Sequence, residues 1–181
     1  MTTEFENVSG SLDIIKTTCL ANRIFGQHFT PMMPRQQIDY ILDTYNSYNA
    51  INERISTGGY KYYSIVCDSR QAGFFAYVPR LGEAVEITEI GVIKKQRGKG
   101  CCKKALDFIA SNARENGAKT VKIKIDKKNE MALNAFKALG MQEIGEEQTK
   151  LMGDFFVEQV ILALDISGDE NDKEYAVSEE E

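Results

Sequence analysis

The spacing of apolar residues changes along the chain and divides it into two parts. Up to about residue 57, apolar positions recur every three or four residues, the period of an amphipathic helix. One helix is predicted to end near Gly26, and a second to begin near Pro34, where proline suits the first helical turn. A third is predicted over residues 47–57, ended by Gly58. The first part of the chain is therefore predicted to be helical.

Strands follow from residue 60. Residues 60–67, 72–78 and 84–92 are rich in β-branched and aromatic side chains, and turn residues separate them. Three strands joined by short turns predict an antiparallel meander.

Helices and strands alternate in the remainder. Asn129 suits a helix N-cap, and Gly140 suits the position just after a helix end. Helices are predicted over residues 100–116 and 129–140, and strands over residues 121–126, 141–144 and 155–164. The whole pattern predicts an α/β fold with a central mixed, mostly antiparallel sheet flanked by helices.

Composition and charge restrict the class of protein. A chain of 181 residues favours one domain, predicted here over residues 1–166. Residues 169–181 hold seven acids and one lysine, so residues 167–181 are predicted to be a disordered acidic tail. No segment is basic enough to suggest nucleic acid as a partner.

Four cysteines without metal-ligand spacing, no signal peptide and no apolar run long enough to cross a bilayer favour the cytoplasm. We expect no metal site and no membrane partner. The single histidine, His28, is expected in a solvated loop.

The most informative segment covers residues 89–102. A strand ends at Val92, a short basic loop follows, and a helix opens near Gly100. Backbone N–H groups at a helix start lack intrahelical partners and attract anions, and glycines let a phosphate approach them. Arg97 and Lys99 add positive charge. The loop matches neither a Walker loop nor the dinucleotide fingerprint, and a plain tight turn is the alternative.

The loop resembles the pyrophosphate motif of the GNAT superfamily of acyl-CoA-dependent N-acetyltransferases, Arg/Gln-x-x-Gly-x-Gly/Ala. It departs from the motif only at Cys102, which replaces Gly or Ala. A second segment, Asn129-x-x-Ala132-x-x-x-Phe136-x-x-x-Gly140-Met141, is similar to that family's Asn-x-x-Ala-x-x-x-Tyr-x-x-x-Gly-Phe. The resemblance implies a GNAT-type fold, acetyl-CoA as cosubstrate, and acetyl transfer to a primary amine of a small molecule or protein.

The same resemblance implies which residues hold acetyl-CoA. Main-chain groups would bind its pantetheine arm and acetyl oxygen, the glycine loop its pyrophosphate, and a polar side chain would contact it at the following helix. The main-chain groups are those of Ile90, Gly91 and Val92, and the polar side chain is that of Asn129. The residues of the glycine loop are Arg97, Gly98, Lys99, Gly100, Cys101, Cys102 and Lys103.

The family often carries its general base on the strand before the loop. Glu86 lies six residues before Val92, a spacing found in some members, so it is favoured over Glu89. The alternatives are that these carboxylates bind a cationic acceptor, or that both are solvated strand charges. The family's usual acid, a tyrosine, falls at Phe136, which has no proton to give. Water would then protonate the thiolate, or another group such as Tyr40, Tyr45 or Tyr77.

Two other functions stay open. One is a non-catalytic acyl-CoA-binding regulatory module, favoured by Phe136; the other is a protein of this fold with unrelated ligands. The acceptor, a small-molecule or peptide amine, is not specified by these motifs, and a homodimer is also left open.

Overall fold

The computed structural model describes residues 2–81, 83–152 and 155–168. Its elements in chain order are β1 (Thr3–Asn7), α1 (Ser11–Phe29), α2 (Arg35–Asn46), α3 (Tyr48–Ser56), β2 (Lys61–Cys67), β3 (Arg70–Arg80), β4 (Ala84–Val92), a 3-10 turn (Lys94–Gln96), α4 (Cys101–Glu115), β5 (Thr120–Asp126), α5 (Glu130–Ala138), β6 (Gln142–Met152) and β7 (Phe155–Asp165). The acidic residues 169–181 lie outside the described residues, so the predicted tail stays a prediction. No helix of the described residues is long and apolar enough to cross a membrane.

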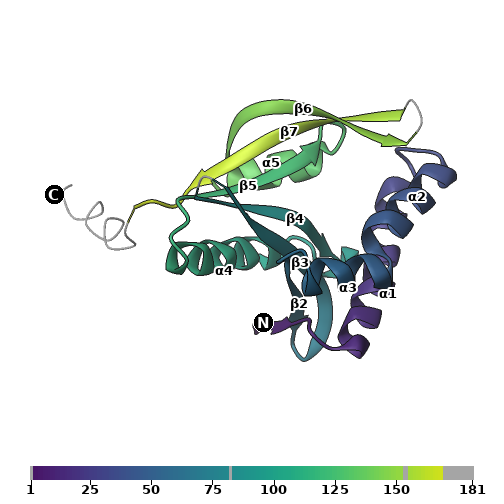
Figure 1. The fold of residues 1–181 in the computed structure, drawn as a ribbon, viewed down its shortest axis with the longest axis horizontal. Coiled ribbons are helices and arrows are strands. Elements are labelled where there is room, and N and C mark those ends of the chain that lie inside the picture. Colours follow the sequence, from purple (N-terminus) through teal and green to yellow (C-terminus); the bar gives the residue numbers. More distant parts are fainter. Residues whose placement is uncertain (1, 82, 153–154, 169–181) are drawn as a thin grey trace.

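The described strands form one sheet in the order β1-β2-β3-β4-β5-β7-β6 (Figure 1). Neighbouring strands pair antiparallel except β4 and β5, which are parallel. The predicted mixed, mostly antiparallel sheet is therefore confirmed, together with the meander of β2, β3 and β4.

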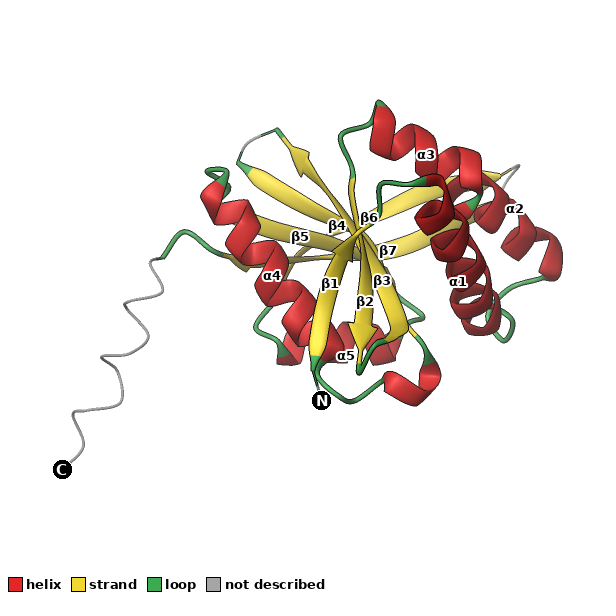
Figure 2. Ribbon diagram, turned by 90° about the horizontal axis from the view of Figure 1, so that it is seen from below, coloured by secondary structure: helices red, strands yellow, loops and turns green. Residues whose placement is uncertain are grey.

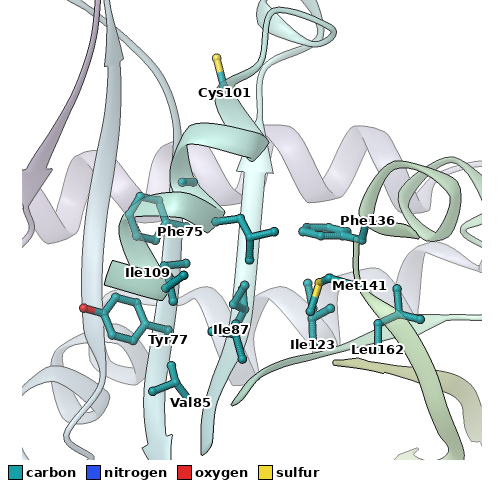
Figure 3. Packing of buried hydrophobic residues seen from close by; sticks show 14 of the residues in the cluster. Phe75, Tyr77, Val85, Ile87, Cys101, Ile109, Ile123, Phe136, Met141 and Leu162 are labelled. Carbon is teal, nitrogen blue, oxygen red and sulfur yellow. The ribbon is translucent and has the colours of Figure 1, made fainter. Parts of the chain in front are cut away.

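Two layers of helices cover the sheet (Figure 2). On one face, α4 and α5 pack on β3, β4, β5 and β7 through a cluster that includes Phe75, Ile109, Ile123 and Leu162 (Figure 3). On the other face, α1 and α3 pack on β2 and β3 through a second cluster that includes Ile24, Ile51, Tyr62 and Phe74. The sheet thus separates two apolar cores.

Two parts of the sheet differ from the sequence prediction. The edge strand β1 was not predicted, because Phe5 is its only large apolar residue. The strand predicted over residues 141–144 is much longer, since β6 continues to Met152 as the partner of β7. Both segments are mostly polar and form strands through pairing with a neighbour, so an apolar pattern could not reveal them.

Both ends of α5 follow the predicted chemistry. The Asn129 side chain accepts a hydrogen bond of 3.2 Å from the Ala132 N–H, which makes it the N-cap of α5. Gly140 has φ +90° and follows α5, with its N–H donating to the Lys137 carbonyl and the Met141 N–H to that of Phe136. This is a Schellman ending, which favours glycine.

Candidate functional site

The site forms where β4 and β5 separate. Their parallel pairing runs from Ala84 opposite Thr120 to Ile87 opposite Ile123, and no further pairing joins them in the part of the chain that the structure describes. Beyond that point a cavity of about 380 Å³ lies between the diverging strands. It is lined by Glu86, Thr88, Glu89 and Ile90 of β4, by residues 123–126 of β5, and by parts of α1, α2, α5, β6 and β7. The divergence opens a passage through the sheet.

A β-bulge sets the direction of the β4 side chains. Ala76 pairs with Glu89 and Tyr77 with Ile87, which leaves Thr88 as the extra residue on β4. Because of this extra residue, Glu86 and Glu89 line the same cavity although they lie three positions apart. Both candidate bases are therefore brought to one site, and neither is a freely solvated strand charge.

The two carboxylates have different surroundings. Glu86 accepts a 2.7 Å ion-pair hydrogen bond from Arg80, whose side chain is 45% exposed. The Glu89 side chain is only 9% exposed and accepts hydrogen bonds from Arg54 (2.5 Å), Asn46 (2.9 Å) and the Tyr62 hydroxyl (3.3 Å). Glu89 thus has three fixed partners, while Glu86 has one on the surface.

Burial raises the pKa of Glu89, against the opposing charge of Arg54. Arg54 also lies over the rings of Tyr45 and Tyr60 and donates to the Tyr45 carbonyl. Arg54 and Glu89 are therefore a buried pair that ties α2 and α3 to β4. The sequence analysis did not predict this role of Arg54, because a single arginine in a polar helix does not indicate a buried ion pair.

The glycine loop has the geometry of an anion site. Gly98 and Gly100 have φ of +73° and +81°, and an added Cβ at either position would meet nothing within 4 Å. The helix α4 begins at Cys101, and the first helical hydrogen bond runs from the Lys104 N–H to the Gly100 carbonyl. The three preceding N–H groups, of residues 101–103, have no intrahelical partner. These features fit the pyrophosphate of acetyl-CoA.

The side chains around this loop divide into two groups. Arg97 donates to the Val92 carbonyl at 2.9 Å, which holds its guanidinium at the loop, whereas Lys103 pairs with Asp107 one turn along α4. Cys101 turns inward instead: its Sγ lies 3.6 Å from that of Cys67, and burial raises its pKa to about 11. Only the backbone of Cys101 can therefore bind an anion. Burial also raises the pKa of Cys102.

Backbone groups of β4 point into the gap. The Ile93 N–H donates to Ala72 of β3. Because N–H directions alternate along an antiparallel edge, the N–H groups of Ile90 and Val92 point away from β3, and that of Gly91 points toward it. The N–H groups of Ile90 and Val92 can therefore bind a ligand, although the Val92 carbonyl already accepts Arg97, and Gly91 contributes through its small size. A Cβ on Gly91 would lie 3.3 Å from Ile24.

His28 lies in the site, which corrects the expectation of a solvated loop residue. It belongs to the last turn of α1, lines the cavity, and its Nε2 lies 3.1 Å from Asn129 Nδ2. Because Asn129 Oδ1 caps α5, its Nδ2 must face His28, and the imidazole accepts through Nε2. Burial lowers the pKa of His28, Arg97 lowers it further, and Asp126 opposes the change. The helical spacing of the first segment includes His28, and this pattern could have placed it in a helix and not in a loop.

Phe136 both packs in the core and lines the cavity, with 4% of its surface exposed (Figure 3). Tyr45 is the tyrosine among the described cavity residues. Tyr77 instead stacks on Tyr63 in the core, where burial raises its pKa, and Tyr40 does not line the cavity. Of the three tyrosines considered as proton donors, the structure therefore brings only Tyr45 to the site.

Comparisons with known proteins agree with this architecture. Residues 25–141 match the model of the acetyltransferase (GNAT) family. A PaiA N-acetyltransferase from Thermoplasma acidophilum, solved in complex with coenzyme A, is similar in structure, with a TM-score of 0.74, 13% identity, and coverage of 91% of this chain and 99% of that one. The ribosomal-protein-S18-alanine N-acetyltransferase from Escherichia coli is similar with a TM-score of 0.64, 16% identity, and coverage of 94% and 98%. A comparison with curated proteins found no match.

The chain belongs to the GNAT acetyltransferase family, because the matched region covers well over half of it. It is an acyltransferase, and acetyl-CoA is its cosubstrate. The fold and the enzyme class predicted from the two motifs are therefore confirmed.

Proposed function

We propose that this protein transfers the acetyl group of acetyl-CoA to a primary amine, in the cavity where β4 and β5 diverge. One observation carries the proposal: β4 leads from a cavity lined by carboxylates to the glycine loop and the start of α4, whose backbone N–H groups can bind an anion. The loop of residues 97–103 holds the pyrophosphate, and the backbone of Ile90 and Val92 holds the pantetheine arm. Asn129 contacts the cosubstrate at the start of α5. A cytoplasmic location remains a prediction from the cysteine content.

The chain's own groups support a direct transfer. An N–H of β4 aimed at the acetyl oxygen stabilises the charge that develops there. Glu86 accepts the proton of the attacking amine, because its carboxylate lines the cavity and its one ion-pair partner is half exposed. The new N–C bond forms, the C–S bond breaks, and the thiolate takes a proton from water or from Tyr45, since Phe136 offers none.

The test has two readouts. Acetyl-CoA at about 100 times its dissociation constant should stabilise the fold by roughly 2.7 kcal/mol, visible as a thermal shift. A panel of primary amines should then release free CoA thiol. A thermal shift without thiol release from any amine would overturn the primary amine as the acceptor, while leaving acetyl-CoA binding intact.

A further inference from the structure

His28 and Asn129 come from distant parts of the chain and meet in the cavity. His28 lies in the last turn of α1, Asn129 is the N-cap of α5, and both line the cavity. Two charges act on the histidine: Arg97 of the glycine loop lowers its pKa, and Asp126 at the end of β5 opposes that change. His28 is therefore close to the ends of both diverging strands, where the pantetheine arm of acetyl-CoA would pass.

The hydrogen bonds of the Asn129 amide allow one arrangement. Its Oδ1 accepts the Ala132 N–H at 3.2 Å, and its Nδ2 faces His28 Nε2 at 3.1 Å. An amide nitrogen only donates, so Nε2 must accept, and the neutral ring carries its proton on Nδ1. The amide is thus held at its oxygen by the helix cap and at its nitrogen by His28.

One donor of this amide is left over. The Asn129 Nδ2 carries two hydrogens, and among the described residues only His28 accepts one of them. Because Asn129 lines the cavity, the other hydrogen can bind an acceptor there. The pantetheine arm has amide carbonyls, which are acceptors of the required kind. An amide already held in place loses less freedom on binding than a free one, so His28 favours the bound state.

Protonation of His28 breaks this arrangement. The imidazolium carries a hydrogen on both nitrogens, so its Nε2–H would face the donor Nδ2. Turning the amide over would satisfy the ring but would take Oδ1 away from the Ala132 N–H and remove the cap of α5. Arg97 and Asp126 are the charged groups that act on the ring, and no charged side chain of α2 or α3 contributes within the described part of the chain.

We propose that His28 is a positioning residue for acetyl-CoA: its neutral ring holds the Asn129 amide with one N–H directed to the pantetheine arm, and protonation of the ring releases the amide. The inference rests on the proposed contact between Asn129 and acetyl-CoA. Affinity for acetyl-CoA is then greatest where His28 is neutral. It falls as the pH drops through the pKa of His28 in the folded protein.

The dissociation constant of acetyl-CoA, measured by calorimetry at pH 8, tests the contact and the positioning separately. Asn129→Ser keeps an oxygen for the helix cap but removes the amide, and should weaken binding by about twofold to tenfold, the range for one neutral hydrogen bond. His28→Ala should weaken binding by a similar factor. His28→Gln should restore it, because its amide oxygen can accept in place of Nε2. Adding His28→Ala to Asn129→Ser should cause no further loss.

The pH dependence distinguishes positioning from packing. The wild-type dissociation constant should rise relative to that of His28→Gln as the pH falls from 8 to about one pH unit below the NMR titration midpoint of His28. Protonation of the phosphates of acetyl-CoA affects both proteins alike and cancels in the ratio. Gln27→Ala is the matched control, because Gln27 lies in the same turn of α1 but is exposed and does not line the cavity. It should bind as the wild type does at every pH.

Two results would overturn the inference while leaving the Asn129 contact intact. One is that Asn129→Ser weakens binding and His28→Ala does not. The other is that His28→Ala and His28→Gln weaken binding equally, with a constant ratio across the pH range, since the ring would then act through packing alone. Unchanged binding by Asn129→Ser would instead overturn the proposed role of Asn129 in holding acetyl-CoA.

Discussion

On β4, Glu86 and Glu89 line one cavity although three positions separate them, because the bulge at Thr88 adds a residue between them. Their partners give them different roles. Glu89 has hydrogen bonds from three groups and holds the helices to the sheet, whereas Glu86 has a single ion pair with the half-exposed Arg80. A proton acceptor needs an accessible oxygen, so we propose Glu86 as the chemical carboxylate and Glu89 as the structural one.

Glu86→Gln tests the chemical role. Removing the base should lower turnover by roughly 100-fold or more, with affinity for acetyl-CoA unchanged. The residual rate should rise at high pH, where the amine deprotonates unaided. Glu143→Gln, which removes an exposed carboxylate paired with Lys137, is the control and should have no effect. A pH–rate profile identical to that of the wild type would remove Glu86 from the mechanism.

Glu89→Ala tests the structural role. It leaves the Arg54 guanidinium buried without its counter-ion, which should cost roughly 3–5 kcal/mol in the free energy of unfolding. Combining Glu89→Leu with Arg54→Met removes both charges and should recover much of that loss. Urea unfolding of the variants measures both quantities. A loss below about 1 kcal/mol for Glu89→Ala would show that the pair does not hold the helices in place.

The local parts of this site could be read from the sequence, and the long-range parts could not. The glycine loop and the Asn129 cap depend on backbone conformation and on residues a few positions apart, so their chemistry is visible in a short segment. The contact between His28 and Asn129 joins residues 101 positions apart. The pairing of Arg54 with Glu89 likewise depends on how α3 packs on the sheet.

The fold shows the same division. Alternation and helical spacing located the apolar strands and helices, because burial of one face requires that pattern. The edge strand β1 and the outer length of β6 are mostly polar, and only pairing with β2 and β7 makes them strands. The bulge at Thr88 is also invisible in sequence, since Glu86 and Glu89 would face opposite sides of a regular strand.

The titration of His28 gives a third prediction. It is the single histidine of the chain, so its ring resonances in NMR should titrate as one group with a pKa below 6.5. The groups that set this value are its own burial, the positive charge of Arg97 and the opposing charge of Asp126. A titration midpoint at or above 6.5 would contradict the buried, neutral ring.

The lowered pKa also sets the sign of a stability change. Well above pH 6.5 the ring is neutral in both states, and His28 causes no pH dependence. As pH falls below 6.5, His28 is protonated in the unfolded chain before it is protonated in the folded protein. The free energy of unfolding therefore decreases until the pH reaches the pKa of His28 in the folded state. His28→Gln should lose less stability than the wild type between pH 7 and pH 5, measured as melting temperature. Parallel curves for the two proteins would disagree with this assignment.

Gly100→Asp tests the anion site. The added carboxylate meets the pyrophosphate, so the thermal shift by acetyl-CoA should disappear. Gly117→Asp is a matched control, because Gly117 also has a left-handed φ, +79°, and open space around its Cβ, but lies at the other end of α4. Both variants carry the same backbone penalty, of about 1 kcal/mol. Loss of the shift in both would trace the effect to folding.

Phe136→Tyr tests the position where this chain departs from its family. Phe136 lines the cavity and also packs in the core, so a new hydroxyl at the ring edge can reach the cavity while the ring keeps its packing. A thiol of pKa near 8.5 is already a fair leaving group, so a positioned acid should raise turnover only several-fold. Stability should change little.

Phe75→Tyr separates a gain at the site from an effect of any buried hydroxyl. Phe75 belongs to the same core cluster but does not line the cavity. Its substitution should cost about 1–3 kcal/mol in the free energy of unfolding, with no gain in turnover, because the hydroxyl finds no partner. An equal loss of stability for Phe136→Tyr would mean that its ring edge faces the core. An unchanged rate with full stability would mean that protonation of the thiolate does not limit turnover, and water then suffices as the acid.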